Sequence, residues 1–175
     1  MKRLLSIFLA ILCLQSCYSQ NQPSKKINMD QTKKNTHPNY SHTDSSKLVL
    51  TNSEWKNLLS PEVYAIAREK GTERPFTSPF ETSKKLGTYY CAACGNPLFK
   101  SNAKFDSGCG WPSFFEPITK SSILYLPDNT LGMKRTEVEC GRCKAHLGHV
   151  FEDGPPPTGL RYCINGVVLD FEEKK

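Results

Sequence analysis

The chain has 175 residues, of which 38% are hydrophobic and 23% are charged, and this suits one folded domain with additional segments. The formal net charge of +6 lies mainly at the N-terminus, where residues 1–16 carry two of the charges and residues 17–50 carry a surplus of three. Residues 51–175 are therefore nearly neutral, which excludes the strongly basic domain that binding to nucleic acid demands.

Residues 1–16 have the features of an export signal. Lys2 and Arg3 precede an apolar run, residues 4–14, that is too short to be a comfortable membrane span. The sequence Leu-Gln-Ser-Cys that ends at Cys17 resembles the lipobox of bacterial lipoproteins, in which the cysteine is lipidated and becomes the first mature residue. The alternative is an ordinary secretory signal that is cut near Ser19. In both cases we expect the protein to be exported to the cell envelope or periplasm, and the lipobox predicts a lipid anchor in the membrane.

Residues 17–47 are predicted to be a disordered tether. They are rich in Asn, Gln, Lys, Ser, Thr and Pro and have few apolar side chains, so they cannot bury enough surface to fold. His37 and His42 lie in this segment, and we interpret them as solvated linker residues rather than metal ligands. The folded domain is expected to comprise residues 48–175.

The domain begins with two helix signals. Thr51-x-x-Glu54 forms a capping box ahead of Trp55, which is followed by leucines at helical spacing. Ser60 then provides an N-cap with proline at the first helical position, and Gly71 is a stop signal. The sequence therefore predicts two short N-terminal helices.

From Gly87 onward the pattern changes to short strands separated by Gly, Pro, Asn or Asp. There is no alternation of strands with helices, so a parallel sheet or a thioredoxin-like fold is not expected. The pattern indicates a mostly β, antiparallel domain. The predicted strands are residues 88–91, 123–126, 135–140, 149–152, 160–165 and 167–171.

Four cysteines form two Cys-x-x-Cys pairs, Cys91 with Cys94 and Cys140 with Cys143. Two such turns supply four thiolates for a tetrahedral structural zinc site, one ion per chain, that would tie the start of the β region to its middle. Rival interpretations are a redox disulfide within one pair, a disulfide framework, or a zinc ribbon that binds nucleic acid. The pairs lack the strand-then-helix context of redox motifs, and the neutral domain argues against nucleic acid.

In residues 160–165, a strand would place Arg161, Cys163 and Asn165 on one face. A thiol beside a guanidinium and an amide is in a setting that favours a thiolate, especially if a neighbouring strand supplies imidazoles. Cys163 could instead be a buried structural thiol, but an apolar slot would not usually recruit Arg and Asn. We therefore interpret Cys163 as reactive.

A second single cysteine, Cys109, is flanked by glycines, so its backbone is free to move and its sulfur can approach another. Trp111 follows two residues later and offers a broad apolar face. On its own Trp111 would be a core residue more often than a binding residue, but next to this cysteine we interpret it as the wall of a binding site.

These motifs resemble the peptide-methionine (R)-S-oxide reductases, the B type of methionine sulfoxide reductase. The resemblance extends over residues 53–171 and rests on several motifs in the family's order. They are His-Leu-Gly-His-Val-Phe-Glu-Asp-Gly from His146, Pro-Thr-Gly-Leu-Arg-Tyr-Cys-Ile-Asn ending at Asn165, Ser-Gly-Cys-Gly-Trp-Pro-Ser-Phe from Ser107, and the two Cys-x-x-Cys pairs.

The resemblance implies a two-sheet β fold, specificity for the R epimer, and a thioredoxin-like electron donor. It also implies that Cys109 is the resolving cysteine and that Trp111 holds the methyl group of methionine sulfoxide in an oxidised protein. An exported enzyme cannot be reached by cytoplasmic thioredoxin, so we expect a thioredoxin-like reductant in the envelope.

The expected chemistry begins with attack of the Cys163 thiolate, helped by Arg161, on the sulfoxide sulfur. His146, His149 and Asn165 are the candidates to bind and protonate the sulfoxide oxygen. Cys163 becomes a sulfenic acid, which Cys109 converts to a disulfide. Two alternatives remain at this point: an envelope oxidoreductase that acts on disulfides, and a zinc-stabilised binding module without turnover.

Overall fold

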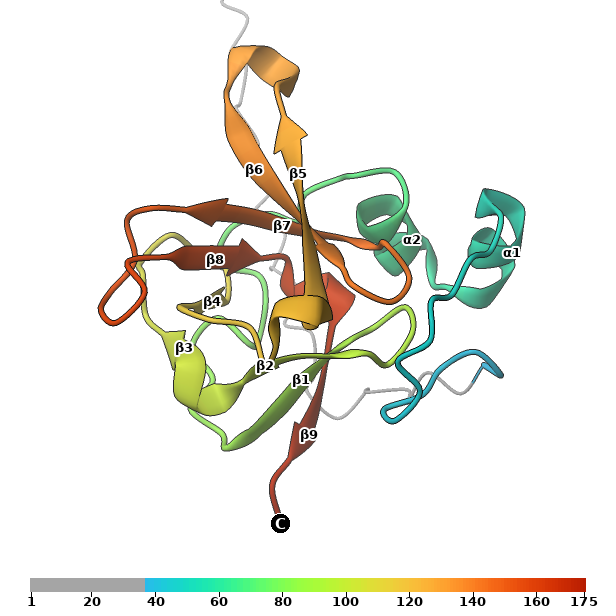
Figure 1. Cartoon of the computed structure of the whole chain (residues 1–175), viewed down its shortest axis with the longest axis horizontal. Coiled ribbons are helices and arrows are strands. Elements are labelled where there is room, and N and C mark those ends of the chain that lie inside the picture. The colour runs from blue at the N-terminus through green and yellow to red at the C-terminus, as the bar shows by residue number, and fades with distance from the viewer. Residues whose placement is uncertain (1–36) are drawn as a thin grey trace, which may run out of the picture.

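The computed structural model describes residues 37–175, so the predicted export signal, Cys17 and most of the predicted tether lie outside the described residues. Two antiparallel sheets and two short helices form the domain, as the sequence predicted (Figure 1). Within residues 37–175, no helix has the length and apolarity needed to cross a membrane.

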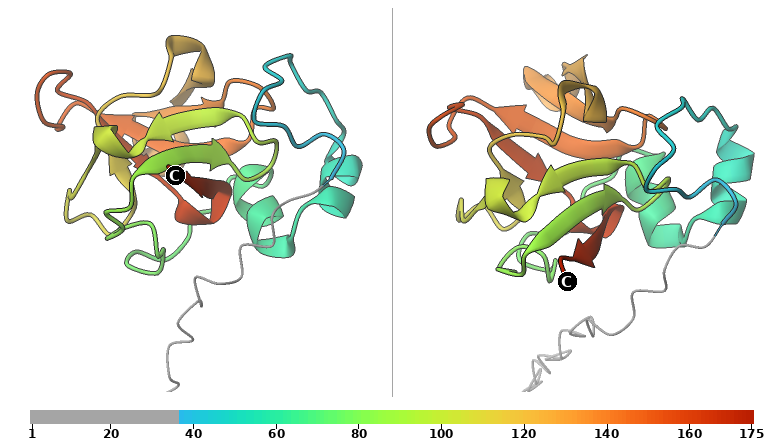
Figure 2. Two further views of the ribbon diagram at one scale, coloured as in Figure 1. Left: turned by 90° about the horizontal axis from the view of Figure 1, so that it is seen from below. Right: turned by 60° about the horizontal axis from the view of Figure 1, so that its bottom comes forward.

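The sheets have three and six strands and lie one over the other (Figure 2). In spatial order, the first sheet consists of β2 (Pro97–Lys100), β1 (Gly87–Cys91) and β9 (Leu169–Glu173). The second consists of β3 (Lys104–Phe105), β4 (Ser113–Phe114), β8 (Arg161–Ile164), β7 (His146–Phe151), β6 (Arg135–Cys140) and β5 (Ile123–Asp128). The hairpin of β5 and β6 extends beyond the other strands (Figure 1).

Aromatic side chains fill the space between the sheets. Phe99 of β2 stacks on Phe114 of β4 with ring centroids 4.4 Å apart, and Tyr89 of β1 meets Phe114 edge-on at 5.0 Å. All three are fully buried. Because aromatic pairs add about 0.5–1.5 kcal/mol beyond the area they bury, this cluster is a major source of the cohesion between the sheets.

The helices pack at one end of the sheets and begin where the sequence predicted. α1 (Asn52–Leu58) starts at the reciprocal capping box of Thr51 and Glu54, and it buries Trp55. α2 (Pro61–Ala67) starts at Ser60, whose side chain accepts a hydrogen bond from the backbone of Val63. α2 ends before the predicted stop at Gly71.

The strand predictions were right in position but wrong at several ends. β7 begins at His146 rather than at residue 149, and β9 begins at Leu169 because residues 166–168 form a 3-10 turn. β8 ends at Ile164, so Asn165 lies outside it. Three short strands, β2, β3 and β4, had not been predicted, because two to four residues carry too little periodicity.

Residues 37–48, which we call the N-terminal strap, are ordered against the domain although the sequence predicted a tether as far as residue 47. His42 stacks on the Tyr90 ring at 3.7 Å, and His37 lies edge-on to Trp55 at 6.3 Å. His37 and His42 are therefore packed against aromatic rings and are not free in solvent. Composition missed this segment because it is held by hydrogen bonds and ring contacts rather than by a hydrophobic stripe.

A β-bulge interrupts the pairing of β6 with β7. Val138 pairs with Gly148 and Glu139 pairs with His146, so Leu147 is an extra residue without a partner in the ladder. Gly148 adopts φ +156°, and a Cβ atom there would lie 2.0 Å from the Cys163 carbonyl oxygen. Bulges re-aim side chains. This one turns His146 and His149, three residues apart, toward the same region, with ring centroids 5.6 Å apart.

We predict that Gly148→Ala lowers the free energy of unfolding by roughly 2–4 kcal/mol, because the added methyl group forces β7 away from β8. The control is Gly132→Ala, since Gly132 also has positive φ (+71°) but no atom lies within 4 Å of a Cβ built there. We expect this control to cost only about 1 kcal/mol. Urea unfolding would measure both, and equal losses would contradict the bulge's role.

Candidate active site and metal centre

Five strands of the second sheet contribute one residue each to a single row across the sheet. In the order of β3, β4, β8, β7 and β6, they are Phe105, Ser113, Cys163, His149 and Glu137. Residues paired directly across antiparallel strands project from the same face. The row is therefore a continuous strip of side chains with Cys163 at its centre, and it is the framework of the candidate active site.

Cys109 completes the site from the loop between β3 and β4. Its Sγ lies 3.6 Å from the Sγ of Cys163, and both thiols are partly buried. The flanking residues Gly108 and Gly110 both have positive φ. At Gly110 the loop passes so close to Phe76 that the Phe76 amide donates a 2.7 Å hydrogen bond to its carbonyl oxygen. The two single cysteines that the sequence identified are thus brought together.

The protonation of this pair differs from the expectation that Cys163 is the activated thiolate. The pKa of Cys163 is raised to about 12, chiefly by burial and also by the adjacent Cys109, and Arg161 only partly opposes this rise. The Arg161 guanidinium is shared with other groups, because it donates two hydrogen bonds to Asp153 at 2.9 and 2.8 Å and lies 4.4 Å over the Phe151 ring. Before a substrate arrives, Cys163 therefore holds its proton.

His149 lies next to Cys163 in the cross-strand row and has a fixed hydrogen-bond partner. Its Nε2 donates to Asp128 Oδ2 at 2.7 Å, and Arg135 donates to the same oxygen at 2.6 Å. Hydrogen bonds from Thr130, with those of His149 and Arg135, hold the pKa of Asp128 far below its usual range. Asp128 therefore stays ionised and orients the imidazole, with Nδ1 left for other contacts.

His146 is 3% exposed and is held by a different carboxylate. Its Nδ1 lies 2.7 Å from Glu137 Oε1, and Lys70 donates to the other Glu137 oxygen at 2.7 Å. Burial lowers the pKa of His146, although Glu137 opposes this. Burial would raise the pKa of Glu137, but hydrogen bonds from Lys70 and His146 outweigh it and lower that pKa. Each histidine thus has its own acid, and the sequence analysis identified neither.

Trp111 and Asn165 are positioned by one residue that sequence reasoning missed, Glu73. The Glu73 carbonyl oxygen accepts a 3.2 Å hydrogen bond from the Trp111 indole, and its amide donates to Asn165 Oδ1 at 3.0 Å. Its carboxylate accepts from the amides of Gly166 and Val167 at 2.6 and 2.9 Å. No local pattern marks Glu73, because its partners lie 38 to 94 residues away.

Asn165 has a different position from the one the sequence predicted. It is 4% exposed, its Oδ1 accepts from Glu73, and its Nδ2 donates to the Leu147 carbonyl oxygen at 3.0 Å. The amide therefore ties the end of β8 to the bulge of β7 and to the Glu73 loop. Strand alternation placed it beside Cys163, but the chain leaves the strand at Ile164.

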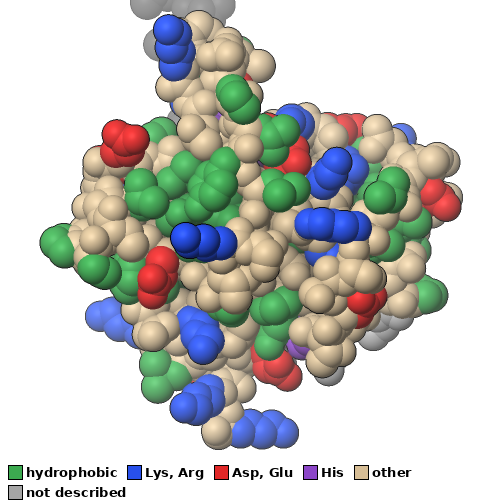
Figure 3. Space-filling model, in the orientation of Figure 1, with side chains coloured by type: hydrophobic (Ala, Val, Ile, Leu, Met, Phe, Trp, Pro, Cys, Tyr) green, Lys and Arg blue, Asp and Glu red, His purple; other side chains and the backbone are tan. Residues whose placement is uncertain are grey.

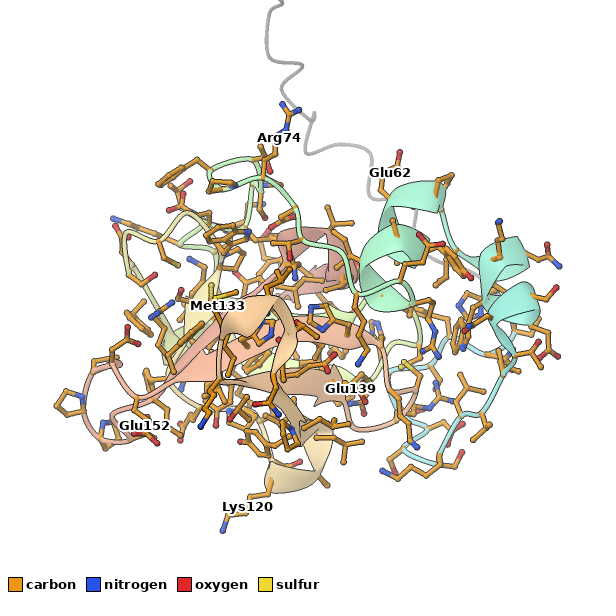
Figure 4. The ribbon with its side chains drawn as sticks, turned by 90° about the horizontal axis from the view of Figure 1, so that it is seen from above. Glu62, Arg74, Lys120, Met133, Glu139 and Glu152 are labelled. Atoms are coloured by element: carbon orange, nitrogen blue, oxygen red, sulfur yellow. The ribbon has the colours of Figure 1, made fainter. Side chains whose placement is uncertain are left out.

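A cavity of about 420 Å³ opens beside Cys109. Its floor is formed by the β3–β4 loop, and its far side by the proline-containing loop after β7. The lining residues are Phe105, Ser107, Cys109, Asp153, Gly154, Pro155 and Arg161. Glu152 marks the start of that loop, at the opposite end of the domain from the helices (Figure 4). A thiol or side chain from outside can reach the Cys109 sulfur through this opening.

The other four cysteines form a separate, fully buried cluster between the two Cys-x-x-Cys turns. The sulfurs of Cys91 and Cys143 are 3.8 Å apart and those of Cys94 and Cys140 are 3.6 Å apart, and all four are free thiols. A tetrahedral site with bonds of about 2.3 Å to sulfur has edges of about 3.8 Å. The donor set therefore fits a metal ion, and none of the four thiols is joined in a disulfide.

The N-terminal strap crosses both Cys-x-x-Cys turns. The Ser41 amide donates to the Cys94 carbonyl oxygen at 3.0 Å, and the Leu48 amide donates to the Arg142 carbonyl oxygen at 2.9 Å. The almost fully buried guanidinium of Arg142 donates back to Cys94 O at 2.7 Å and to Asp44 Oδ2 at 2.6 Å. The strap thus joins the two turns independently of any ion.

Charged side chains of both signs are interspersed on the face shown in Figure 3, and hydrophobic side chains gather to one side of the β5–β6 hairpin. On this face there is no continuous basic surface, in keeping with the near-neutral charge of residues 51–175. This distribution of charge argues against nucleic-acid binding on this face.

Comparison with known proteins identifies close relatives. The SelR domain matches residues 59–173. Peptide methionine sulfoxide reductase MsrB of Pseudomonas putida (strain W619) is 59% identical over 128 residues, which cover 73% of this chain and 96% of that protein. The MsrB of Pseudomonas fluorescens is 60% identical over 124 residues, with 71% and 95% covered. The MsrB of Agrobacterium fabrum is 56% identical over 128 residues, with 73% and 95% covered.

We predict that Asp44→Asn weakens the strap and accelerates metal release about two- to fivefold, the effect expected for loss of an exposed ion pair. The readout is loss of the thiolate absorption of Co²⁺-loaded protein in excess chelator. Hydrogen bonds from Ser46 and Arg142 lower the pKa of Asp44 to about 2. The stabilisation that ionised Asp44 gives is therefore fully present above the pKa it has in the unfolded chain, and it is lost as the pH falls toward the pKa in the folded chain. The difference should therefore persist from pH 5 to pH 8.

The matched control is Glu152→Gln, which removes an exposed carboxylate on a loop far from the strap. Release at the wild-type rate from Asp44→Asn, or equal acceleration in both variants, would contradict the strap's role.

Proposed function

The chain belongs to the SelR-domain family of peptide methionine sulfoxide reductases, MsrB, and we propose that it reduces the R epimer of methionine sulfoxide in oxidised proteins. Family membership makes it an oxidoreductase that returns methionine sulfoxide to methionine. The choice of epimer, the chemical steps and the electron donor are our proposal, which the motifs and the geometry around Cys163 support.

The observation that carries the proposal is the 3.6 Å separation of the Cys109 and Cys163 sulfurs on the active-site side of the second sheet. In the first step, Cys163 loses its proton and attacks the sulfoxide sulfur. The oxygen is protonated and passes to Cys163, so methionine is released and Cys163 becomes a sulfenic acid. Cys109 then attacks Cys163, the S–S bond forms, and the oxygen leaves as water.

The protons for the sulfoxide oxygen come from the imidazoles on β7. His149 is adjacent to Cys163 in register, and Asp128 holds its Nε2. This leaves Nδ1 as the atom through which His149 can transfer a proton, and it favours His149 over the more deeply buried His146 as the acid. His146 and its partner Glu137 support the orientation of this region. Asn165 holds the backbone of Glu73 and Leu147 in place. The positive charge of Arg161 near Cys163 favours the thiolate form of that cysteine.

Trp111 is the proposed wall for the methyl group of the substrate. Its indole nitrogen is fixed by the Glu73 carbonyl oxygen, which leaves the apolar ring face as the part that a ligand can contact. A flat apolar surface next to the thiol pair would distinguish the methyl group of the sulfoxide from its oxygen, and this is the physical basis we propose for selecting one epimer.

We propose that the buried thiol cluster, Cys91, Cys94, Cys140 and Cys143, holds one structural zinc ion. Four thiolates leave no open coordination position, so the metal would stabilise the fold and take no part in the reaction. The ion would tie the end of β1 to the end of β6.

The disulfide of Cys109 and Cys163 must be reduced by an external dithiol. The cavity beside Cys109 gives such a thiol access to the Cys109 sulfur. Because we expect residues 1–16 to direct export and Cys17 to be lipidated, we propose a thioredoxin-like reductant of the cell envelope as the donor. A membrane-anchored enzyme at that location would repair exported proteins.

The first prediction from this proposal concerns the reaction itself. The metal-loaded domain, residues 37–175, should reduce a peptide carrying the R sulfoxide and not the S sulfoxide, with dithiothreitol as reductant. Cys163→Ser should lower turnover by at least about 10³-fold because the nucleophile is lost. Separated epimers would be followed by mass spectrometry, as loss of one oxygen. Folding of the variant would be checked by its metal content.

Turnover of the S epimer at a comparable rate, or of neither epimer by folded protein, would contradict the proposal. Activity that survives in Cys163→Ser would exclude Cys163 as the nucleophile.

The second prediction concerns location. In a bacterial host with lipoprotein processing, the full chain should fractionate with membranes, and its mature N-terminus should be a lipidated Cys17. Cys17→Ala should shift the protein to the soluble fraction. Mass spectrometry of the N-terminal peptide is the measurement. A mature N-terminus near Ser19, or an unprocessed Met1, would contradict the lipid anchor.

A further inference from the structure

Two serine hydroxyls surround the sulfur of Cys109. Ser107 Oγ donates to Cys109 Sγ at 3.0 Å, and Ser113 Oγ lies 3.5 Å from the same sulfur. The two hydroxyl oxygens are themselves 2.7 Å apart. Ser113 is 1% exposed, so its hydroxyl is buried beside Ser107 and Cys109. No comparable pair of hydroxyls contacts Cys163 among the hydrogen bonds of residues 37–175.

The backbone builds this arrangement. Ser113 lies on β4 directly opposite Cys163, and Ser107 lies in the loop that turns back at Gly108. The Cys109 amide donates to Ser107 Oγ at 3.4 Å, so the loop is closed around the hydroxyl. The Trp111 carbonyl oxygen is within 3.1 Å of Ser113 Oγ and can take its proton. Ser113 can instead donate to Ser107, whose proton then points at the sulfur.

The charge distribution follows these contacts. Burial would raise the pKa of Cys109, but hydrogen bonds from Ser107 and Ser113 outweigh it, and the pKa is lowered. For Cys163 the contributions that raise the pKa, burial and the neighbouring Cys109, outweigh the one from Arg161 that lowers it. The other charged groups that face Cys109 are Arg161 and Asp153 across the cavity, and Asp106, which accepts a hydrogen bond from the Gly108 amide.

We propose that Ser107 and Ser113 are positioning residues that hold Cys109 as a thiolate before the substrate binds, so that the resolving attack begins as soon as Cys163 is oxidised. The inference deepens the proposed function and rests on it. In the attack, the Cys109 thiolate bonds to the Cys163 sulfur and the S–O bond breaks. Overall, one sulfoxide, one Cys109 thiolate, one Cys163 thiol and one proton give methionine, the disulfide and water.

The preset thiolate gives the enzyme a specific advantage. A sulfenic acid is oxidised irreversibly if it persists, whereas a disulfide is reversible. A thiolate held 3.6 Å away shortens the life of the sulfenic acid without requiring a proton transfer at that moment. It also leaves the first step to Cys163, which must give up its own proton when the sulfoxide arrives.

The first test measures alkylation of Cys109 in the metal-loaded full chain carrying Cys163→Ser. Iodoacetamide labelling would be followed from pH 5 to pH 10 and assigned to Cys109 by peptide mapping. Adding Ser107→Ala or Ser113→Ala should move the midpoint up by about one pH unit, so labelling at pH values well below the wild-type midpoint falls about tenfold. The control is Ser53→Ala, an exposed serine on α1. Unchanged midpoints in both folded variants would overturn the proposal.

The second test separates the two chemical steps in enzyme that retains Cys163. After mixing with one equivalent of R sulfoxide peptide and no reductant, samples are quenched and assayed for methionine and for the Cys109–Cys163 disulfide. In Ser107→Ala and Ser113→Ala, disulfide formation should slow about tenfold more than methionine release. Equal slowing of both steps would overturn the proposal. If neither the wild type nor the variants release methionine, the proposed function fails. If the alkylation midpoints of the first test nevertheless shift, the assignment of Cys109 as a thiolate stands.

Discussion

The register of β8 between β4 and β7 is the constraint on which the site depends. Because Cys163 pairs with Ser113 on one side and His149 on the other, one alignment of three strands sets the surroundings of the proposed nucleophile. A slip by one residue would turn Cys163 into the core and bring Tyr162 or Ile164 into its place. The bulge at Leu147 and Gly148 fixes this register, since the close approach of Gly148 to the Cys163 carbonyl oxygen tolerates no side chain. Glu73 and Asn165 secure the same strand at its end.

The six described cysteines are divided between two sites with opposite requirements. Four are buried, meet at the tips of two turns, and are joined further by the N-terminal strap, so they are suited to permanent ligation. The other two are partly buried, with their sulfurs 3.6 Å apart, and Cys109 lies beside the cavity in a loop that contains Gly108 and Gly110. This arrangement suits the reacting pair that we propose. The strap precedes the region matched by the SelR domain, residues 59–173.

Much of this could be predicted from the sequence, because the relevant signals were local. The capping box at Thr51, the Cys-x-x-Cys spacings and the glycines beside Cys109 each fix a conformation within a few residues. The partners of the histidines could not be predicted in this way. Asp128, Glu137 and Lys70 come from three other segments, and they are recognisable only once β5, β6 and the segment after α2 are placed around β7. Asn165 was misplaced because the alternation of side chains along β8 was continued one residue beyond the end of the strand. The N-terminal strap was missed because hydrogen bonds to backbone groups leave no trace in the composition of a segment.

The most direct test of the account is to identify the sulfurs that react in a single turnover. Reduced, metal-loaded enzyme would be mixed with one equivalent of R sulfoxide peptide without reductant, and its products would be mapped by mass spectrometry. The account predicts one methionine per enzyme, one disulfide between Cys109 and Cys163, and full retention of the metal by the other four cysteines. A disulfide that includes any of those four, or release of the metal with turnover, would contradict the division of the cysteines into a reacting pair and a structural cluster.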